Sequence, residues 1–314
     1  MIKVKALKKY YGSVQAVRGI SFNVNDGEIV GFLGANGAGK STTLKVITGY
    51  LIPTAGTVEV NDYNILEHTH EIQQMVGYLP EFNPLYPEMK VHDYLEFVGA
   101  IREIRGKQFK QALSRVVDQC GLKGVVHREI GTCSKGYKQR IGLAAAMLHD
   151  PEILILDEPV TGLDPNQIVE IRELIKKLGK EKLVLISSHI LQEIQATVDR
   201  IVIIHEGQIV ADGTSDELIS NFMGNTFLTL EVKNADQQSL DNLSVAIAEV
   251  KMVKVEAKKG YHLLQLEYPR ETDPRENIFQ YAVHSQWVIL KMTPRSTNLE
   301  DLFRQLTLPG GAHA

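Results

Sequence analysis

The segment Gly34-Ala35-Asn36-Gly37-Ala38-Gly39-Lys40-Ser41 constrains the fold more than any other part of the chain. It follows the short apolar run Glu28–Leu33, predicted to be a strand, and precedes a helical stretch from Lys40 to about Thr48. The spacing G-x-x-x-x-G-K-[ST] between a strand and a helix is typical of a P-loop. Its backbone N–H groups can point at phosphate oxygens, and the helix N-terminus adds positive potential. The sequence therefore predicts a nucleotide-phosphate site on a parallel α/β sheet.

The residue types in this segment suit that chemistry. Lys40 is expected to contact the β- and γ-phosphates of ATP, and Ser41 to supply a hydroxyl to Mg²⁺. The other predicted nucleotide contacts are Gly34, Asn36, Gly37, Ala38, Gly39 and Thr42. The alternative is a glycine-rich turn without a ligand. A Rossmann dinucleotide site is excluded because the stretch contains no G-x-G-x-x-G.

Two carboxylates follow another apolar strand. Ile153–Leu156 has the pattern of a buried strand, and Asp157 and Glu158 come directly after it. Ligands bind outside the carboxyl ends of strands in open α/β sheets. Asp157 is therefore expected to hold Mg²⁺, and Glu158 to take a proton from an attacking water. The alternative is an ordinary solvated strand end.

The pattern of elements divides the chain after about residue 222. We expect 1–222 to form one α/β domain with a mixed-sheet core and a helical subdomain at about 82–150. Two helices are predicted in that subdomain, over 91–105 and 107–121, with Gly106 breaking them. Residues 223–314 are predicted to form an accessory α+β domain. Its order βαββαβ, followed by a last helix over about 298–306, is typical of a small ferredoxin-like domain.

Composition excludes several classes of protein. The chain has 314 residues, is 44% hydrophobic and has a net charge of −4, so disorder is excluded for most of the chain. Its mild acidity gives no electrostatic footprint for DNA or RNA. No apolar run approaches the ~18 residues of a transmembrane helix, and Met1–Lys9 lacks the features of a signal peptide. Cys120 and Cys133 are too few for a disulfide framework or a structural zinc site. We expect a cytoplasmic protein without a nucleic-acid partner.

Five segments, in one order, resemble a known family. Cys133-Ser134-Lys135-Gly136-Tyr137 resembles the signature Leu-Ser-Gly-Gly-Gln of ATP-binding cassette (ABC) proteins. Gly162-Leu163-Asp164-Pro165 resembles the D-loop of that family, and His189 follows a strand as its switch histidine does. With the P-loop and Asp157-Glu158-Pro159, these segments identify residues 1–222 as a member of the ABC ATP-binding proteins.

The resemblance implies a P-loop ATPase fold and a head-to-tail pair, with itself or with another ABC ATPase. ATP would lie between the P-loop of one chain and the signature of the other. Ser134 and Gly136 would then contact the partner chain's ATP, while His189 would hydrogen-bond the γ-phosphate. Asp164 would help to shape the dimer interface. Tyr11 resembles the adenine-stacking residue of the family; Tyr10 competes for that role, and an ordinary strand-end tyrosine is the alternative.

The chain departs from the family pattern at two places. Glu81 stands where the family usually has the glutamine of its Q-loop, and a carboxylate there is still a hard oxygen ligand for Mg²⁺. In the signature, Cys133 and Tyr137 replace leucine and glutamine. A buried cysteine can act as a small hydrophobe. Loss of the glutamine amide puts one phosphate or ribose contact in doubt.

In transporters of this family, the region after the Q-loop borders the groove that receives a helix of the membrane subunit. Here that region is 82–89, whose aromatic residues and Met89 suit contact with a helix lying in a groove. The alternative is that these residues pack locally under a proline-rich loop. The resemblance implies the ATPase subunit of an ABC-2-type exporter, peripheral at the inner face of the cell membrane and driving a separate permease. Within that branch the sequence is most similar to gliding-motility-associated ATP-binding proteins, partly through its ending Asn298-Leu299-Glu300-Asp301-Leu302-Phe303.

Three other functions are considered. The first is an export ATPase for a drug, a polysaccharide or another envelope component. The second is a soluble ABC ATPase acting on ribosomes or DNA, which the single cassette and the absence of a basic face disfavour. The third is a catalytically inactive regulatory module, which intact Lys40, Asp157, Glu158 and His189 disfavour.

Overall fold

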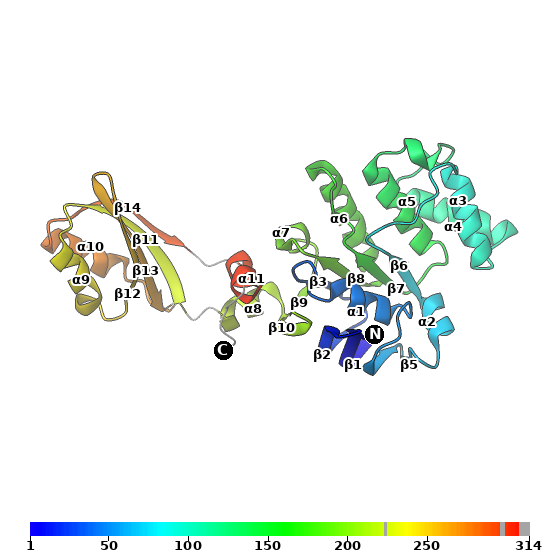
Figure 1. Cartoon of the computed structure of the whole chain (residues 1–314). Coiled ribbons are helices and arrows are strands. Elements are labelled where there is room, and N and C mark those ends of the chain that lie inside the picture. Colours follow the sequence, from blue (N-terminus) through cyan, green and yellow to red (C-terminus); the bar gives the residue numbers. More distant parts are fainter. Residues whose placement is uncertain (223–224, 270, 296–298, 308–314) are drawn as a thin grey trace. The chain divides into compact units, whose positions relative to one another are not determined.

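The computed structural model describes residues 1–222, 225–269, 271–295 and 299–307 (Figure 1). These residues form two compact units. One contains Met1–Ser215 together with Leu306 and Thr307, and the other contains the described residues of Asp216–Gln305. Helix α8 (Ser215–Phe222), at whose end the sequence predicts the domain boundary, lies almost entirely in the second unit.

The first unit is built on a six-stranded sheet with the strand order β10-β9-β3-β8-β7-β6. The strands from β9 to β6 pair in parallel, and β10 pairs with β9 antiparallel. Their bounds are β3 Ile29–Leu33, β6 Val76–Leu79, β7 Ile153–Asp157, β8 Leu183–Ser188, β9 Arg200–His205 and β10 Gln208–Gly213. All residues of β3, β7 and β8 are buried, as expected for parallel strands that are covered on both faces.

A second, antiparallel sheet packs against this one. Its order is β2-β1-β4-β5. The bounds are β1 Ile2–Tyr11, β2 Val14–Val24, β4 Ala55–Val60 and β5 Tyr63–Asn64. Phe22 of β2 stacks on Phe32 of β3 with ring centroids 5.3 Å apart. This contact belongs to one buried apolar core that also includes Leu44 and Ile47 from the helix after the P-loop.

The helices of the first unit are α1 Lys40–Ile47, α2 Thr69–Met75, α3 Val91–Ile101, α4 Gly106–Gln119, α5 Lys135–Met147, α6 Pro165–Gly179 and α7 Leu191–Ile194, with a 3₁₀ turn at Ile130–Thr132. The predicted helix over 91–105 ends earlier, at Ile101. Glu103 has φ +60°, which an α-helix cannot contain, and Gly106 begins α4 rather than separating the two helices. The break therefore lies at 102–105.

The second unit has the element order that its sequence predicts. A four-stranded antiparallel sheet of order β12-β13-β11-β14 carries two helices in a βαββαβ chain. The bounds are β11 Asn225–Lys233, α9 Gln237–Ala246, β12 Lys251–Lys258, β13 Tyr261–Pro269, α10 Arg275–His284, β14 Val288–Arg295 and α11 Leu299–Thr307. Its core joins Leu228 and Leu264 of the sheet to Leu240 and Ile278 of the helices. Asn298, part of the ending noted above, lies outside the described residues.

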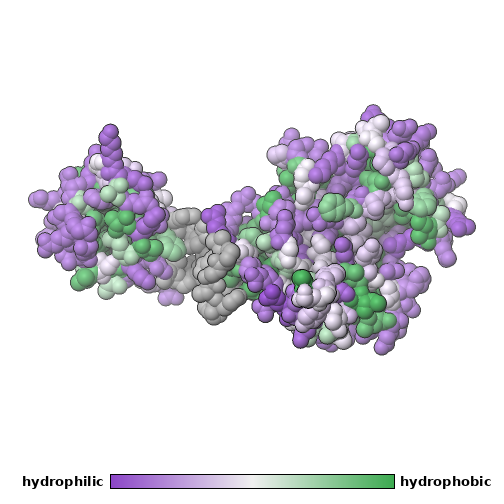
Figure 2. All heavy atoms as spheres, viewed as in Figure 1, coloured by the Kyte–Doolittle hydropathy of each residue, from purple (hydrophilic) through white to green (hydrophobic). Residues whose placement is uncertain are grey.

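On the face shown in Figure 2, hydrophilic side chains alternate with small hydrophobic patches on both units. Within the described ranges, none of the helices combines the length and the apolarity that crossing a membrane requires.

Candidate active site

Parallel pairing brings the predicted functional segments to one edge of the six-stranded sheet. Strands β3, β8, β7 and β6 are consecutive neighbours, so their carboxyl ends meet at the same edge. The P-loop follows β3, His189 follows β8, Glu158 follows β7, and Glu81 follows β6 after Pro80. A pocket of about 290 Å³ lies there. Its lining residues are Ala16, Asn36, Gly37, Gly39, Lys40, Ser41, Thr42, Glu81 and Glu158.

The P-loop backbone depends on glycine where its chain reverses. Gly39 has φ +109° and is the N-cap of α1, and a Cβ there would come 2.6 Å from the carbonyl oxygen of Ala16. Left-handed φ and this close approach together exclude any side chain. The turn aims the first turn of α1, and with it Lys40 and Ser41, into the pocket. The helix N-terminus at this point favours a bound anion.

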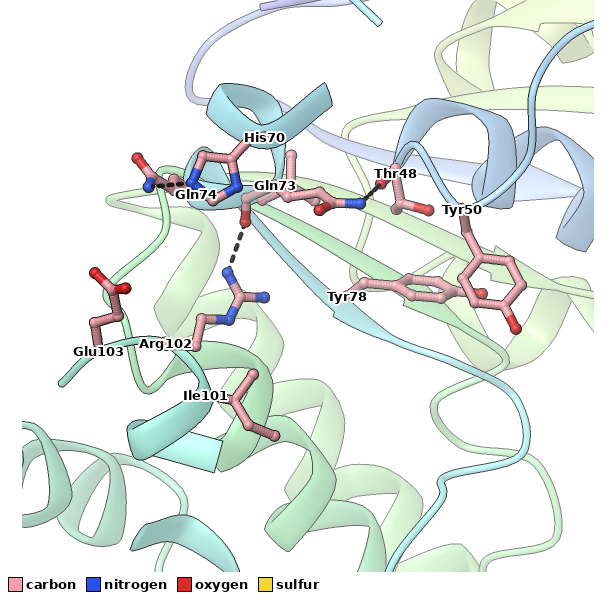
Figure 3. A pocket seen from close by; sticks show the side chains of 10 residues that line it. Thr48, Tyr50, His70, Gln73, Gln74, Tyr78, Ile101, Arg102 and Glu103 are labelled. Atoms are coloured by element: carbon pink, nitrogen blue, oxygen red, sulfur yellow. Dashed lines mark hydrogen bonds between the residues drawn. The ribbon is translucent and has the colours of Figure 1, made fainter. Parts of the chain in front are cut away.

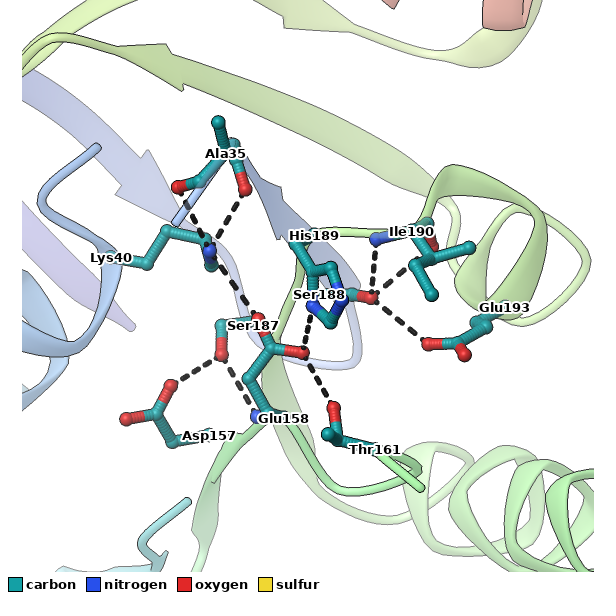
Figure 4. Close-up of polar contacts among 11 residues, drawn as sticks. Ala35, Lys40, Asp157, Glu158, Thr161, Ser187, Ser188, His189, Ile190 and Glu193 are labelled. Atoms are coloured by element: carbon teal, nitrogen blue, oxygen red, sulfur yellow. Dashed lines mark hydrogen bonds and ion pairs between the residues drawn. The ribbon is translucent and has the colours of Figure 1, made fainter. Parts of the chain in front are cut away.

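The ammonium group of Lys40 folds back over the P-loop backbone at the wall of the pocket. Its Nζ donates to the carbonyl oxygens of Gly34, at 2.8 Å, and Ala35, at 3.2 Å. It also pairs with Glu158 Oε1 at 3.3 Å (Figure 4). Lys40 and Glu158 are each 5% exposed. A buried ammonium group is thus neutralised by the carboxylate across the pocket.

The other oxygen of Glu158 accepts two hydrogen bonds. Thr161 Oγ1 donates to Oε2 at 2.9 Å, and His189 Nδ1 lies 2.8 Å from the same oxygen (Figure 4). Burial by itself raises the pKa of Glu158, but His189, Lys40 and Thr161 outweigh it and leave that pKa below its ordinary value. Glu158 is therefore ionised at neutral pH and held by three donors.

Glu158 also has a strained backbone. Its φ is +52°, in the left-handed region that side chains rarely adopt. Its N–H donates to Ser187 Oγ at 3.0 Å, which helps to hold this conformation. Strain of this kind, kept by surrounding contacts, is concentrated at functional sites.

Asp157 is held differently, on the buried side of the same strand end. Ser187 Oγ donates to its Oδ1 at 2.5 Å, whereas its Oδ2 is buried without a hydrogen-bond partner. The hydroxyl of Tyr78 is also buried and unpartnered. Burial, and next the charge of Asp157, raise the pKa of Tyr78.

No sequence motif singles out Thr161, Ser187 or Tyr78. Thr161 lies three residues after Glu158, and Ser187 pairs directly with Asp157 across β8 and β7. Polar residues at the ends of neighbouring buried strands were the available signal, because only a partner would offset the cost of burying them. Choosing the partner required the strand order.

The donor set at this edge fits Mg²⁺. Ser41 offers a hydroxyl and Glu81 a carboxylate, both lining the pocket, and Asp157 is the nearby buried carboxylate. Magnesium prefers such hard oxygen ligands.

The predicted adenine contact, Tyr11, is not among the residues that line the pocket. It is 46% exposed, and Lys9 Nζ lies 5.5 Å from its ring centroid. Tyr10 is 39% exposed and is likewise not a lining residue. Gly34 and Ala38 also lie outside the lining and pack against each other, since a Cβ on Gly34 would come 3.1 Å from that of Ala38.

The residues predicted to face a partner chain lie at two helix N-termini. Ser134 is the N-cap of α5 and accepts from Tyr137 N–H at 3.3 Å. Asp164 is the N-cap of α6 and accepts from Gln167 N–H at 3.0 Å. Gly136 lies against α6, since a Cβ there would come 2.8 Å from the Gln167 side chain. Ser134 and Asp164 therefore each cap a helix of the chain itself.

A larger cavity, of about 510 Å³, opens beside the sheet (Figure 3). Its lining residues are Thr48, Tyr50, His70, Gln73, Gln74, Val76, Tyr78, Ile101, Arg102 and Glu103. Tyr50 and Ile101 are 72% and 67% exposed. The predicted groove segment 82–89 contributes no lining residue, although Phe82 is 84% exposed. Sequence reasoning missed this cavity because its walls come from four separate segments.

Comparison with known proteins agrees with this geometry. The family model described as "ABC transporter" matches residues 17–161. The linearmycin resistance ATP-binding protein LnrL of Bacillus subtilis (strain 168) is 34% identical over 312 residues, which are 98% of each chain. The bacitracin transport ATP-binding protein BcrA of Bacillus licheniformis is 41% identical over 69% of this chain and 71% of its own. The Nod factor export ATP-binding protein I of Ralstonia nicotianae (strain ATCC BAA-1114 / GMI1000) is 31% identical, covering 98% of this chain and 94% of its own.

Solved structures are similar over the first unit. The structure of an ATP-binding subunit of an ABC transporter has a TM-score of 0.64 and 30% identity, and covers 71% of this chain and 93% of its own. The dimeric structure of a bacterial ABC transporter cassette has a TM-score of 0.62 and 26% identity, covering 68% and 98%. These matches and the P-loop pocket lead to one conclusion: the chain belongs to the ABC transporter family of ATP-binding proteins, which bind and hydrolyse ATP.

Proposed function

We propose that this chain powers a separate membrane permease that exports a compound such as an antibiotic or an envelope component. The single observation that carries the ATPase part is the contact of Lys40 and His189 with the two oxygens of Glu158 at the phosphate pocket. The export part is supported by relatives named for linearmycin resistance, bacitracin transport and Nod factor export. Two of these match 98% of this chain, so the likeness includes the second unit.

In this proposal the nucleotide rearranges an existing charge network. Lys40 leaves Glu158 for the phosphates, and the freed carboxylate accepts a proton from the attacking water. His189, now beside Glu158, contacts the γ-phosphate. Ser41, Asp157 and Glu81 would hold Mg²⁺, which neutralises phosphate charge when bound.

We further propose that the chain works as a head-to-tail pair at the inner face of the membrane. The N-terminus of α5, at Ser134 and Gly136, would face the ATP of the partner chain, because a helix N-terminus favours an anion. Asp164 would lie at the interface, and Tyr11 is proposed to stack on adenine when the nucleotide binds.

The cavity beside the sheet is the proposed docking site for the permease. Its exposed rim combines Tyr50 and Ile101 with the charged side chains of Arg102 and Glu103 (Figure 3). A wall that mixes aromatic and aliphatic side chains with polar and charged ones suits an amphipathic helix laid into a groove. A cytoplasmic helix of the membrane subunit is the occupant that the family membership favours.

A permease for gliding motility remains a narrower form of the same proposal. None of the relatives described above is named for motility, whereas their names refer to linearmycin resistance, bacitracin transport and Nod factor export. A nucleic-acid partner is disfavoured by the net charge of −4.

Capture of the ATP-bound state tests this proposal. Glu158→Gln would be expressed as bait, membranes would be gently solubilised with ATP present, and co-purifying proteins would be identified by mass spectrometry. A multi-span membrane protein is expected. Ribosomal or DNA-bound proteins in its place would refute the transport function and leave the ATPase chemistry intact.

A matched pair of surface variants tests the docking site. Tyr50→Asp in the bait should release the membrane protein, because Tyr50 is 72% exposed on the cavity rim. Leu66→Asp is the control, since Leu66 is 56% exposed and does not line the cavity. Equal capture by both variants would refute docking at this cavity.

A further inference from the structure

Two buried polar atoms without hydrogen-bond partners lie at the end of neighbouring strands in the first unit. They are Asp157 Oδ2 and the hydroxyl oxygen of Tyr78. Buried polar atoms are rarely left unpaired, because each loses its hydrogen bonds to water without gaining a partner. One is an acceptor and the other carries a proton, so each could satisfy the other.

Strand register places the two side chains on the same face of the sheet. Tyr78 of β6 pairs with Ile155 of the parallel strand β7. Asp157 comes two residues after Ile155, and side chains two apart in a strand point to the same side. Tyr78 also packs against the apolar core that contains Ile155. Tyr78 and Asp157 are therefore diagonal neighbours.

The hydrogen bond that Asp157 already accepts comes from the strand on its other side. Ser187 of β8 pairs with Asp157 and donates to Oδ1 at 2.5 Å. Because β7 lies between β8 and β6, Ser187 approaches the carboxylate from one side and Tyr78 from the other. The oxygen left unpaired is the one that Ser187 does not use.

We propose that Tyr78 is a positioning residue that donates its hydroxyl proton to Asp157 Oδ2 and fixes this carboxylate toward Mg²⁺-nucleotide. The inference rests on the metal site under Proposed function. Each carboxylate oxygen has two lone pairs, so both can accept a hydrogen bond and still face a metal-bound water. A phenylalanine would fill the same space but would leave Oδ2 unpaired.

The ring of Tyr78 also lines the 510 Å³ cavity (Figure 3). In this proposal one side chain has its ring at the docking cavity and its buried hydroxyl on Asp157 at the active site. A segment that enters the cavity would press on the ring that orients Asp157. Binding of the partner in the cavity would therefore change the orientation of Asp157, and with it the binding of Mg²⁺-nucleotide.

The test compares Tyr78→Phe with Tyr281→Phe in the full chain. The control removes a tyrosine hydroxyl that donates to Ser239 O at 2.7 Å in the second unit. Binding of a fluorescent ATP analogue is titrated against Mg²⁺, without hydrolysis. Tyr78→Phe should raise the half-saturating Mg²⁺ concentration about tenfold or more, the usual effect of losing a group that orients a metal ligand. Binding without Mg²⁺ should stay unchanged, and the control should match the wild type.

A second comparison shows whether Tyr78 acts through Asp157. In an Asp157→Asn background, adding Tyr78→Phe should change the Mg²⁺ dependence no further, because the two residues form one unit. Overlapping Mg²⁺ titrations of the wild type and Tyr78→Phe would overturn the inference, as would full additivity of the two changes. Nucleotide binding by the wild type that ignores Mg²⁺ would refute the proposed metal site itself, and this inference with it.

Discussion

Replacing Glu158 by glutamine removes the negative charge that organises the active site and keeps the size of the side chain. If Glu158 takes the proton from the attacking water, Glu158→Gln should lower ATP turnover by about 10²–10⁴-fold. Each tenfold step corresponds to about 1.36 kcal/mol, so the barrier should rise by about 2.7–5.4 kcal/mol. ATP binding should survive, because Lys40 is then released from its ion pair with this carboxylate.

The same substitution has a separate cost for the protein without nucleotide. Oε1 faces Lys40 at 3.3 Å, and Oε2 faces Thr161 and His189 at 2.9 and 2.8 Å. A glutamine has one acceptor oxygen and one NH₂ group, so it can satisfy only one of these two sides. Losing a hydrogen bond to a charged group lowers the free energy of unfolding by about 1.5–3 kcal/mol.

Steady-state phosphate release measures the first effect, and urea unfolding with and without ATP measures the second. Glu193→Gln is the matched control, because Glu193 accepts from Ser188 Oγ at 3.3 Å in the same cluster. It should keep near-normal turnover. Turnover of Glu158→Gln within tenfold of the wild type would refute the assignment of Glu158 as the base. A failure to retain ATP would show that its charge serves binding instead.

Three further predictions concern packing and ionisation in the first unit. Burial, and next the charge of Arg102, lower the pKa of His149 to about 4, so protons bind the unfolded chain more strongly. The contribution of His149 to the free energy of unfolding should therefore be complete above the ordinary pKa of about 6.5 and fall by up to about 1.4 kcal/mol per pH unit as the pH drops toward 4. In urea unfolding, His149→Gln should show a weaker dependence of this free energy on pH, and equal slopes in the variant and the wild type would contradict the prediction. Burial raises the pKa of Cys120 to about 12, so iodoacetamide at pH ~8 should modify this thiol in urea but not in the folded protein. Peptide mass mapping measures the modification, and equal rates of modification in the two states would contradict the prediction. A Cβ on Gly142 would lie 2.0 Å from Asn83 Nδ2, so Gly142→Ala should lower the free energy of unfolding by about 1–3 kcal/mol. Adding Asn83→Ala should restore part of that loss, and an unchanged midpoint in Gly142→Ala would refute the contact.

Local chemistry explains why much of the fold could be predicted. The strand, P-loop and helix at 28–48 are encoded by contiguous residues, since glycine supplies φ +109° at position 39 and the apolar run requires burial. The βαββαβ order of the second unit also follows from local periodicity. The end of α3 was misplaced, because its break depends on Glu103 in a left-handed conformation, which the sequence pattern does not signal.

The sequence by itself determined which residues are candidates for the chemistry: Lys40 begins the helix after the P-loop, Asp157 and Glu158 end one strand pattern, and His189 follows another. Only the tertiary structure decided which of them meet. The parallel order β3-β8-β7-β6 brings the ends of strands more than a hundred residues apart in the chain to one edge, and pairs Glu158 with Lys40 and His189. The same order places Tyr78 diagonal to Asp157 on the neighbouring strand. Such contacts depend on which strands become neighbours, and that is settled by burial of the whole core rather than by any local segment.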